Sequence, residues 1–184
     1  RHTRYWRDWS SDVCSSDLAP TAKRVAQMVM LVACARRHGL IVSATRLVAF
    51  GALDPIIAHR AEACAAVDAA AWHASQPGRR LGDAFGDIVS AYAAHGFGDE
   101  WHKHHQGGVT AYENREIQAR PDSTHIIEVG QAFAWNPSIT GTKSEDTMLL
   151  TATGAQALSH TGDWPMIDVS IAGNVYRRPA IWVR

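Results

Sequence analysis

Two apolar stretches near the start of the chain restrict its fold more than any other feature. Residues 25–33 and 40–50 are rich in Val, Ile, Leu and Thr, and the polar link at residues 34–39 ends in Gly39. β-Branched residues favour strands, and a polar link with a glycine is typical of the turn between two of them. The pattern therefore predicts two buried strands that are joined as a hairpin.

Two helices are predicted directly after this hairpin. Asp54 and Pro55 indicate a helix start, because an Asp side chain accepts from the first backbone N–H groups and Pro suits the first helical position. Apolar residues then recur every three or four positions, which predicts two narrow stripes that face a sheet. The first stripe, which ends before Pro77-Gly78, comprises Ile57, Ala61, Cys64, Val67 and Ala71, and the second, which ends before Gly96, comprises Leu81, Phe85, Ile88 and Tyr92.

Beyond residue 96 the chain consists of short apolar runs that are separated by Gly, Asn and Pro. This texture predicts antiparallel strands with turns between them. Strands, two helices and further strands, in this order, predict an α+β domain whose helices gather on one face of the sheet.

Composition argues against several classes of protein. The 184 residues include 18 basic and 18 acidic side chains, so there is no strong field to recruit nucleic acid or an anionic membrane. The longest apolar run, residues 25–35, is far shorter than the roughly 20 residues of a membrane-spanning helix. Cys14, Cys34 and Cys64 are too widely spaced for a disulfide framework or a metal knuckle, which fits a reducing cytoplasm.

Residues 1–18 differ from the rest of the chain in composition and in hydrophobic periodicity. They have no consistent period of 2 or 3.6, and they lack the apolar core and the cleavage pattern of a signal peptide. The run DWSSDVCSSDL at residues 8–18 resembles the translation of a common sequencing adapter. We therefore expect residues 1–18 to be an artefactual or disordered tail and residues 19–184 to carry the domain.

Two motifs carry a resemblance to a known family. The first is HHQGG at residues 104–108 with Tyr112 and Arg115 after it, and the second is FAWNP at residues 133–137 with KSEDT after it. In order and spacing they resemble the closing strands of the pita-bread family, which includes methionine aminopeptidase, aminopeptidase P, prolidase and creatinase. The resemblance implies that residues 19–184 form the C-terminal portion of a pita-bread domain, with a curved antiparallel sheet.

Most metal ligands of that family have no counterpart here. Its peptidases hold two divalent metals with two Asp, one His and two Glu side chains, and the carboxylates offset the repulsion between the cations. The resemblance places Val32 and Ser43 at the Asp positions, His105 at the His position, and Asn136 and Glu145 at the Glu positions. It thus implies a degenerate site, with His105 and Glu145 as candidate catalytic and metal-binding residues and at most one weakly held divalent metal.

Further contacts with a substrate follow from the same resemblance. Tyr112 takes the position of a substrate-handling His, and Asn136 and Arg115 are the other candidate substrate-binding residues. Arg115 and Glu116 could alternatively form a buried ion pair. We predict that the His105 and Glu145 side chains share one cavity.

Other charged neighbours are interpreted without a catalytic role. Adjacent residues of a strand point to opposite faces, so Glu145 should point inward while Asp146 serves a turn or the surface. The run from His102 to His105 lacks a paired carboxylate, which favours a solvated or hydrogen-bonded His cluster over a metal site. Cys34 and Cys64 lie in apolar runs, where a thiol is most often a small buried apolar group.

Three functions remain open. The first is a homologue of the peptidases, inactive as given, whose pocket binds a peptide or a small amino-acid-like ligand. The second is an active hydrolase, either a metallo-aminopeptidase or a creatinase-like enzyme that needs no metal. The third is a structural or dimerising domain, and the resemblance implies a homodimer under all three.

Overall fold

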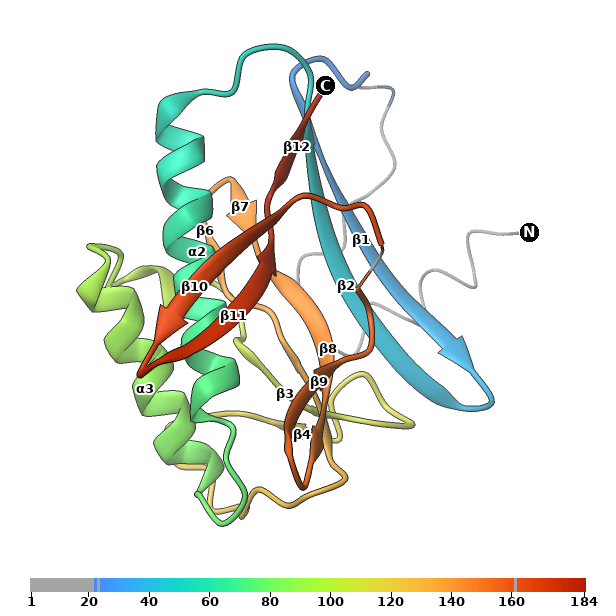
Figure 1. Ribbon diagram of the computed structural model, residues 1–184, viewed down its shortest axis with the longest axis vertical. Helices are drawn as coiled ribbons and strands as arrows, with labels where there is room; N and C mark the ends of the chain where they lie inside the picture. The colour runs from blue at the N-terminus through green and yellow to red at the C-terminus, as the bar shows by residue number, and fades with distance from the viewer. Residues whose placement is uncertain (1–21, 23, 161) are drawn as a thin grey trace.

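The computed structural model describes residues 22, 24–160 and 162–184. The expectations for residues 1–18 lie outside these residues. Figure 1 shows a long hairpin, the helices that follow it and a set of shorter strands that lie between them and beside them. This is the predicted order of strands, helices and strands.

The long hairpin consists of β1 (Met28–Arg37) and β2 (Leu40–Ala49), which pair antiparallel along their whole length. The predicted hairpin is confirmed and β2 is largely buried, but β1 is not: it is an edge strand and most of its residues are exposed. The link between the strands is also shorter than residues 34–39. His38 and Gly39 alone make the turn, with φ of 51° and 90°. Two successive residues with positive φ match the twist of the flanking strands, so the strands extend up to the turn.

The main sheet has eight strands, in the order β1-β2-β8-β5-β3-β4, with β9 beside β8 and β12 beside β2. All pairs are antiparallel except β12 with β2, which are parallel. The strands that follow the hairpin are β3 (Gly107–Thr110), β4 (Ile117–Gln118), β5 (Ala132–Trp135), β8 (Glu145–Thr151), β9 (Gly154–Ala157) and β12 (Ile181–Val183). The sheet is a curled half-barrel, as the resemblance implied.

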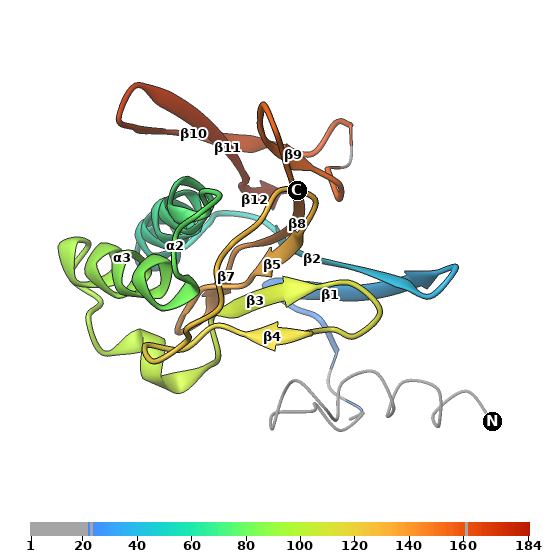
Figure 2. The ribbon, with the colours of Figure 1, turned by 90° about the horizontal axis from the view of Figure 1, so that it is seen from below.

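Both predicted helices are present, as α2 (Pro55–Ala74) and α3 (Leu81–Ala94), and they lie on one face of the sheet (Figure 2). The side chain of Asp54 accepts from the backbone N–H of Ile56 at 2.7 Å, so the predicted helix start is confirmed. A short 3-10 helix, η1 (Glu100–Lys103), follows α3. Tyr92, Phe133 and Met148 are buried in the core between the helices and the sheet.

The stripe predicted for α2 is too narrow. Ala65 and Ala69 are also buried, because a second layer covers the helix on the side away from the sheet. This layer is the hairpin of β10 (Met166–Ile171) and β11 (Asn174–Pro179), which contacts α2 (Figure 2). A separate small hairpin consists of β6 (Ser138–Ile139) and β7 (Thr142–Lys143).

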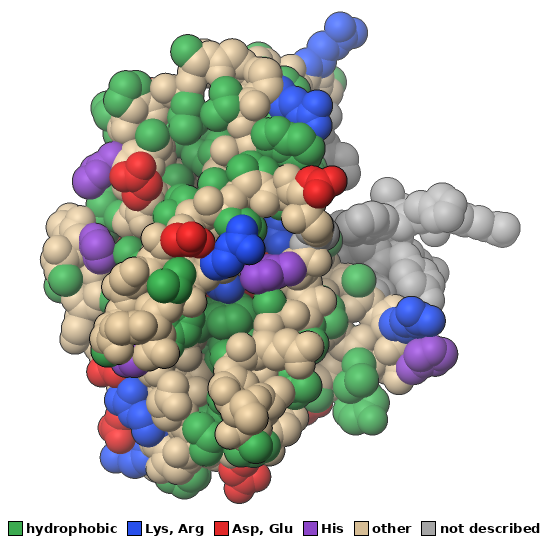
Figure 3. All heavy atoms as spheres, in the orientation of Figure 1, with side chains coloured by type: hydrophobic (Ala, Val, Ile, Leu, Met, Phe, Trp, Pro, Cys, Tyr) green, Lys and Arg blue, Asp and Glu red, His purple; other side chains and the backbone are tan. Residues whose placement is uncertain are grey.

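The surface is chemically mixed. On the face drawn in Figure 3, basic and acidic side chains are interspersed and form no large patch of one sign. Within the described part of the chain, no helix is long and apolar enough to cross a membrane.

Candidate functional site

A row of residues crosses the sheet at the level of Glu145. Val32 of β1 lies opposite Thr45 of β2, and Thr45 lies opposite Glu145 of β8. Directly opposed residues of neighbouring strands share a face, and the Thr45 hydroxyl donates to Oε2 of Glu145 at 2.7 Å. The register therefore brings one of the predicted Asp positions, Val32, onto the face that carries Glu145.

Asn136 continues this row at the end of β5. The pairing of Trp135 with Asp146 places Asn136 next to Glu145, and the Asn136 backbone N–H donates to the Gln106 carbonyl at 3.1 Å. The Asn136 side chain is buried, and its Oδ1 accepts no hydrogen bond from the residues that the structure describes. Asn136 is therefore where the resemblance implied, beside Glu145.

The Glu145 carboxylate is enclosed by donors. Lys143 Nζ lies 2.9 Å from Oε2, and an Arg115 guanidinium nitrogen lies 3.3 Å from Oε1. Burial alone would raise the pKa of Glu145, but Lys143 and Arg115, with the hydrogen bond from Thr45, outweigh burial and lower the pKa to about 2. Glu145 is thus a permanent anion whose two oxygens already accept from three side chains.

His104 and His105 lie at the same site, just before β3. Their rings stack with centroids 4.4 Å apart. Burial lowers the pKa of His105 to about 3, and the charges of Arg115 and Lys143 act in the same direction, while Glu145 opposes them. His105 is therefore neutral at pH 7 and lies within the electrostatic reach of Glu145.

Ser43 occupies the second predicted Asp position, two residues before Thr45 on the same face of β2. Its hydroxyl donates to Sγ of Cys34 at 3.3 Å, and its backbone N–H donates to the Thr147 hydroxyl at 2.8 Å. Ser43 is 1% exposed. It packs between strands as a satisfied polar residue.

Tyr112 lies further out, in the loop after β3. Its side chain is 62% exposed and its ring lies over Gly39 at the tip of the β1–β2 hairpin. In the same loop, Glu116 Oε1 accepts from the backbone N–H groups of Tyr112 and Glu113. Of the two interpretations that were open for Arg115, the structure has the buried ion pair, but its partner is Glu145 and not Glu116, which closes the loop.

Comparison with known proteins agrees with this architecture. The sequence profile of metallopeptidase family M24 matches residues 11–152, which is more than half of the chain. The chain belongs to metallopeptidase family M24. A comparison with curated protein sequences gives no match.

Solved structures show the same fold. A dipeptidase from Pyrococcus horikoshii is 20% identical, with a TM-score of 0.70 over 77% of this chain and 42% of that chain. A prolidase from Pyrococcus furiosus has 20% identity, a TM-score of 0.69 and coverages of 77% and 44%. The N-terminal domain of the FACT complex subunit SPT16 from chickpea is 17% identical, with a TM-score of 0.65 over 81% of this chain and 41% of that chain. This M24 chain therefore spans less than half of the length of the structures that it resembles.

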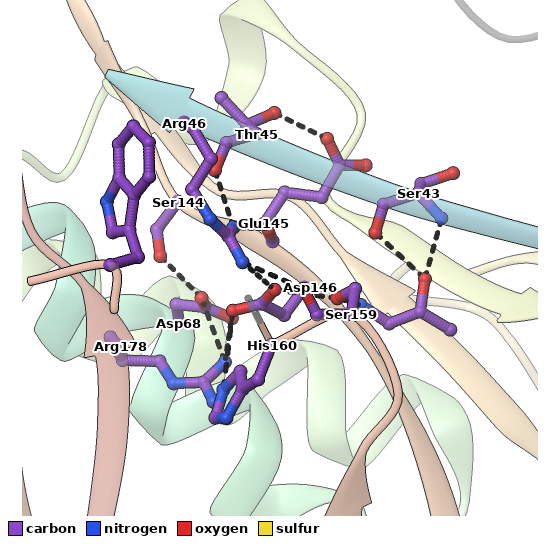
Figure 4. Close-up of polar contacts among 12 residues, drawn as sticks. Ser43, Thr45, Arg46, Asp68, Ser144, Glu145, Asp146, Ser159, His160 and Arg178 are labelled. Atoms are coloured by element: carbon purple, nitrogen blue, oxygen red, sulfur yellow. Dashed lines mark hydrogen bonds and ion pairs between the residues drawn. The ribbon is translucent and has the colours of Figure 1, made fainter. Parts of the chain in front are cut away.

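The opposite face of the M24 sheet carries a second polar cluster (Figure 4). Asp146 points away from Glu145 and is 0% exposed, so its predicted place at a turn or the surface is wrong. Its Oδ1 accepts from Arg46 at 2.7 Å and from the Ser159 hydroxyl at 2.6 Å. His160 Nε2 lies 3.6 Å from its Oδ2. Two charges of opposite sign offset each other here, which lets the carboxylate stay inside.

Arg178 of β11 completes this cluster from the C-terminal hairpin. Its guanidinium lies 3.7 Å from the ring centroid of Trp72 and 3.4 Å from Oδ2 of Asp68 on α2. Ser144 donates to the same Asp68 oxygen at 2.5 Å. Burial raises the pKa of Asp68 to about 6, although Arg178 and Ser144 pull the pKa down. The cluster ties α2, β8 and β11 together.

Sequence reasoning missed this second cluster. One signal was present: Asp68 lies four residues after Cys64 and next to Val67, on the predicted apolar face of the first helix. A charged residue on such a face needs a buried partner. Nothing in the sequence identifies that partner as Arg178, which lies 110 residues away.

The Glu145 site does not fit the metal pair of M24 peptidases. Bridging metals need free carboxylate oxygens, but those of Glu145 already accept from Thr45, Lys143 and Arg115. Among the described residues, no three His, Cys, Asp or Glu side chains are arranged to hold a metal ion.

Proposed function

We propose that this chain is an M24-family domain that binds a peptide or small amino-acid-like ligand at the Glu145 site without dinuclear metal chemistry. One observation carries the proposal: two built-in cations, Lys143 and Arg115, occupy the carboxylate oxygens of Glu145. The positions that the resemblance assigns to three further acids hold Val32, Ser43 and Asn136.

Electrostatics oppose a metal at this place. At 4 Å and an effective dielectric constant of about 20, two unit charges interact by about 4 kcal/mol, so one cationic side chain would repel a dication by roughly 8 kcal/mol. Lys143 and Arg115 both lie at the site, and Glu145 can offset only part of their repulsion. Displacing them from Glu145 would leave their own buried charges without an acceptor.

The test is metal content together with peptidase activity. The purified chain is dialysed against manganese or cobalt, analysed by inductively coupled plasma mass spectrometry, and assayed with Xaa-Pro dipeptides. We expect substoichiometric metal and no turnover. Two metal ions per chain with turnover would refute the proposal and establish the alternative, an active family hydrolase.

A gain-of-binding variant sharpens this test. Asn136→Glu with Lys143→Met adds one carboxylate and removes one cation at the site, and we expect it to raise the metal content above that of the parent. Asn174→Glu with Lys103→Met makes the same charge change at exposed positions and should leave the metal content unchanged.

Two further properties belong to this proposal. We propose that the protein forms a homodimer and works in a reducing cytoplasm, where Cys34 and Cys64 stay free thiols as they are in the structure. Size-exclusion chromatography with light scattering tests the dimer, and a monomer mass at micromolar concentration would contradict it.

A further inference from the structure

The charges around Glu145 do not balance. Lys143 and Arg115 each place a cation against one carboxylate, at 2.9 and 3.3 Å. The side chains of Lys143, Arg115 and Glu145 are 10%, 6% and 3% exposed, so all three are largely removed from water. Two cations and one anion leave a surplus of one positive charge in a place where charge is costly.

Neighbouring acids do not supply the missing negative charge. Glu116 lies exposed and accepts from backbone N–H groups of its own loop. Asp146 lies on the opposite face of the sheet, where Arg46 pairs with it at 2.7 Å. The surplus therefore belongs to the Glu145 site.

Both cations have donors to spare. Arg115 Nε is buried and has no acceptor within the described residues. A Lys ammonium has three N–H donors, and across the same residues Glu145 is the one acceptor of Lys143. A buried donor without an acceptor is destabilising, and a bound acceptor would remove that cost.

The net charge of the site decides what it attracts. None of the three charged side chains is freely exposed, so a molecule that enters from solvent meets their combined charge, which is positive. An anionic group is attracted to this site, and a cationic group is repelled.

We propose that the Glu145 site binds the carboxylate of a small molecule or peptide, with Arg115 and Lys143 as its two cationic partners. The surplus is one charge, which a monocarboxylate neutralises and a phosphate dianion would exceed. The proposal rests on the proposed function, because only a site without metals leaves Arg115 and Lys143 as the groups that a ligand meets.

The experiment compares two probes that differ in one group. N-acetylglycine carries a carboxylate, and N-acetylglycinamide replaces it with a neutral amide of similar shape. Isothermal titration calorimetry of the full chain at pH 7 should show the carboxylate binding about tenfold more tightly or better, since hydrogen bonds between charged partners are the stronger ones. This comparison needs no variant, so it does not depend on how well any variant folds.

Two variants should change the affinity for N-acetylglycine in opposite directions. Arg115→Gln removes a cation and should weaken N-acetylglycine binding about tenfold. Glu145→Gln removes the anion and should tighten binding, whereas a site built for cations would lose affinity. Arg79→Gln is the matched control, because Arg79 pairs with Asp87 at an exposed position.

The outcomes separate this inference from the proposed function. Equal binding of the two probes, undetectable binding of N-acetylglycine, or weaker binding in Glu145→Gln would each overturn carboxylate binding. These binding results are independent of the metal content of the chain, on which the proposed function is tested. A dinuclear metal centre found by elemental analysis would overturn the proposed function itself, whatever the probes do.

Discussion

Lys143 Nζ lies 2.9 Å from Oε2 of Glu145, and the Thr45 hydroxyl donates to the same oxygen at 2.7 Å. This contact joins the end of β7 to the start of β8. It holds the carboxylate as an anion and occupies the oxygen that a bridging metal would need. The chemistry of the site therefore depends on the side chain two residues before Glu145.

Replacing Lys143 with Met should raise the pKa of Glu145. The ammonium is the group that lowers this pKa most, and Arg115 and Thr45 would remain. We expect the free energy of unfolding at pH 7 to fall by roughly 1–3 kcal/mol, less than for a buried pair with no other partner. Carboxyl-carbon NMR titration measures the pKa, and urea denaturation measures the stability.

Lys103→Met is the control for this change. Lys103 also pairs with a carboxylate, that of Glu100, but its side chain is 58% exposed. Exposed pairs contribute about 0–1 kcal/mol, so this variant should stay close to the parent. An unchanged pKa of Glu145 in Lys143→Met would contradict the assigned contact.

His105 should make stability depend on pH in the acidic range. Its pKa is about 3 in the folded chain and 6.5 as a free side chain, so the unfolded chain binds the proton first. The stability that neutral His105 contributes is complete above pH 6.5 and is lost as pH falls toward 3. His104 acts in the same direction, because burial lowers its pKa too.

The variant His105→Gln tests this. Between pH 6 and 5 the stability of the parent should fall more steeply than that of the variant, by up to about 1.4 kcal/mol per pH unit. Glu145 titrates below this pH range, because its pKa is about 2 in the folded chain and 4.5 as a free side chain. Denaturant titrations at several pH values give the slopes, which should agree above pH 7.5. Equal slopes at pH 5–6 would rule out a buried neutral ring.

Arg178→Met should destabilise the chain by about 3–5 kcal/mol. It leaves Asp68 buried without its cation and removes the stacking on Trp72. Arg177→Met is a close control, because Arg177 is the preceding residue of β11 and pairs with Asp168 at 66% exposure of both side chains. The control should change stability by about 0.5 kcal/mol or less. Similar losses of stability in both variants would contradict a stabilising role for the buried contacts of Arg178 with Asp68 and Trp72.

Gly107→Ala should prevent stable folding. A Cβ at this position would lie 2.2 Å from the Ala134 carbonyl oxygen, and the φ of 107° is unfavourable for any other residue. Gly86→Ala is the opposite case, since Gly86 is exposed inside α3 with nothing within 4 Å of the added Cβ. That variant should gain about 0.4–1 kcal/mol. Thermal denaturation distinguishes the two, and a folded Gly107→Ala with the stability of the parent would refute the close approach of β3 and β5.

Much of the fold could be predicted from short-range patterns in the sequence. Asp54-Pro55 predicts the start of α2 because helix capping involves residues two apart, and Gly39 marks the hairpin turn because the turn depends on two adjacent φ angles. The exposed outer layer was harder to predict. The β10–β11 hairpin buries the far side of α2, and its contact with a helix more than 90 residues earlier has no local trace in the chain.

The site divides in the same way. The sequence by itself determined the residue types that the resemblance sets against the family ligands: Val32 and Ser43 in the first hairpin and Asn136 in the second motif. Only the tertiary structure decided what Glu145 touches. Thr45 lies 100 residues from Glu145 along the chain, and Arg115 lies 30 residues away. Sheet register and loop packing bring these groups together, and contacts over such separations depend on the whole fold, not on any pattern within one segment.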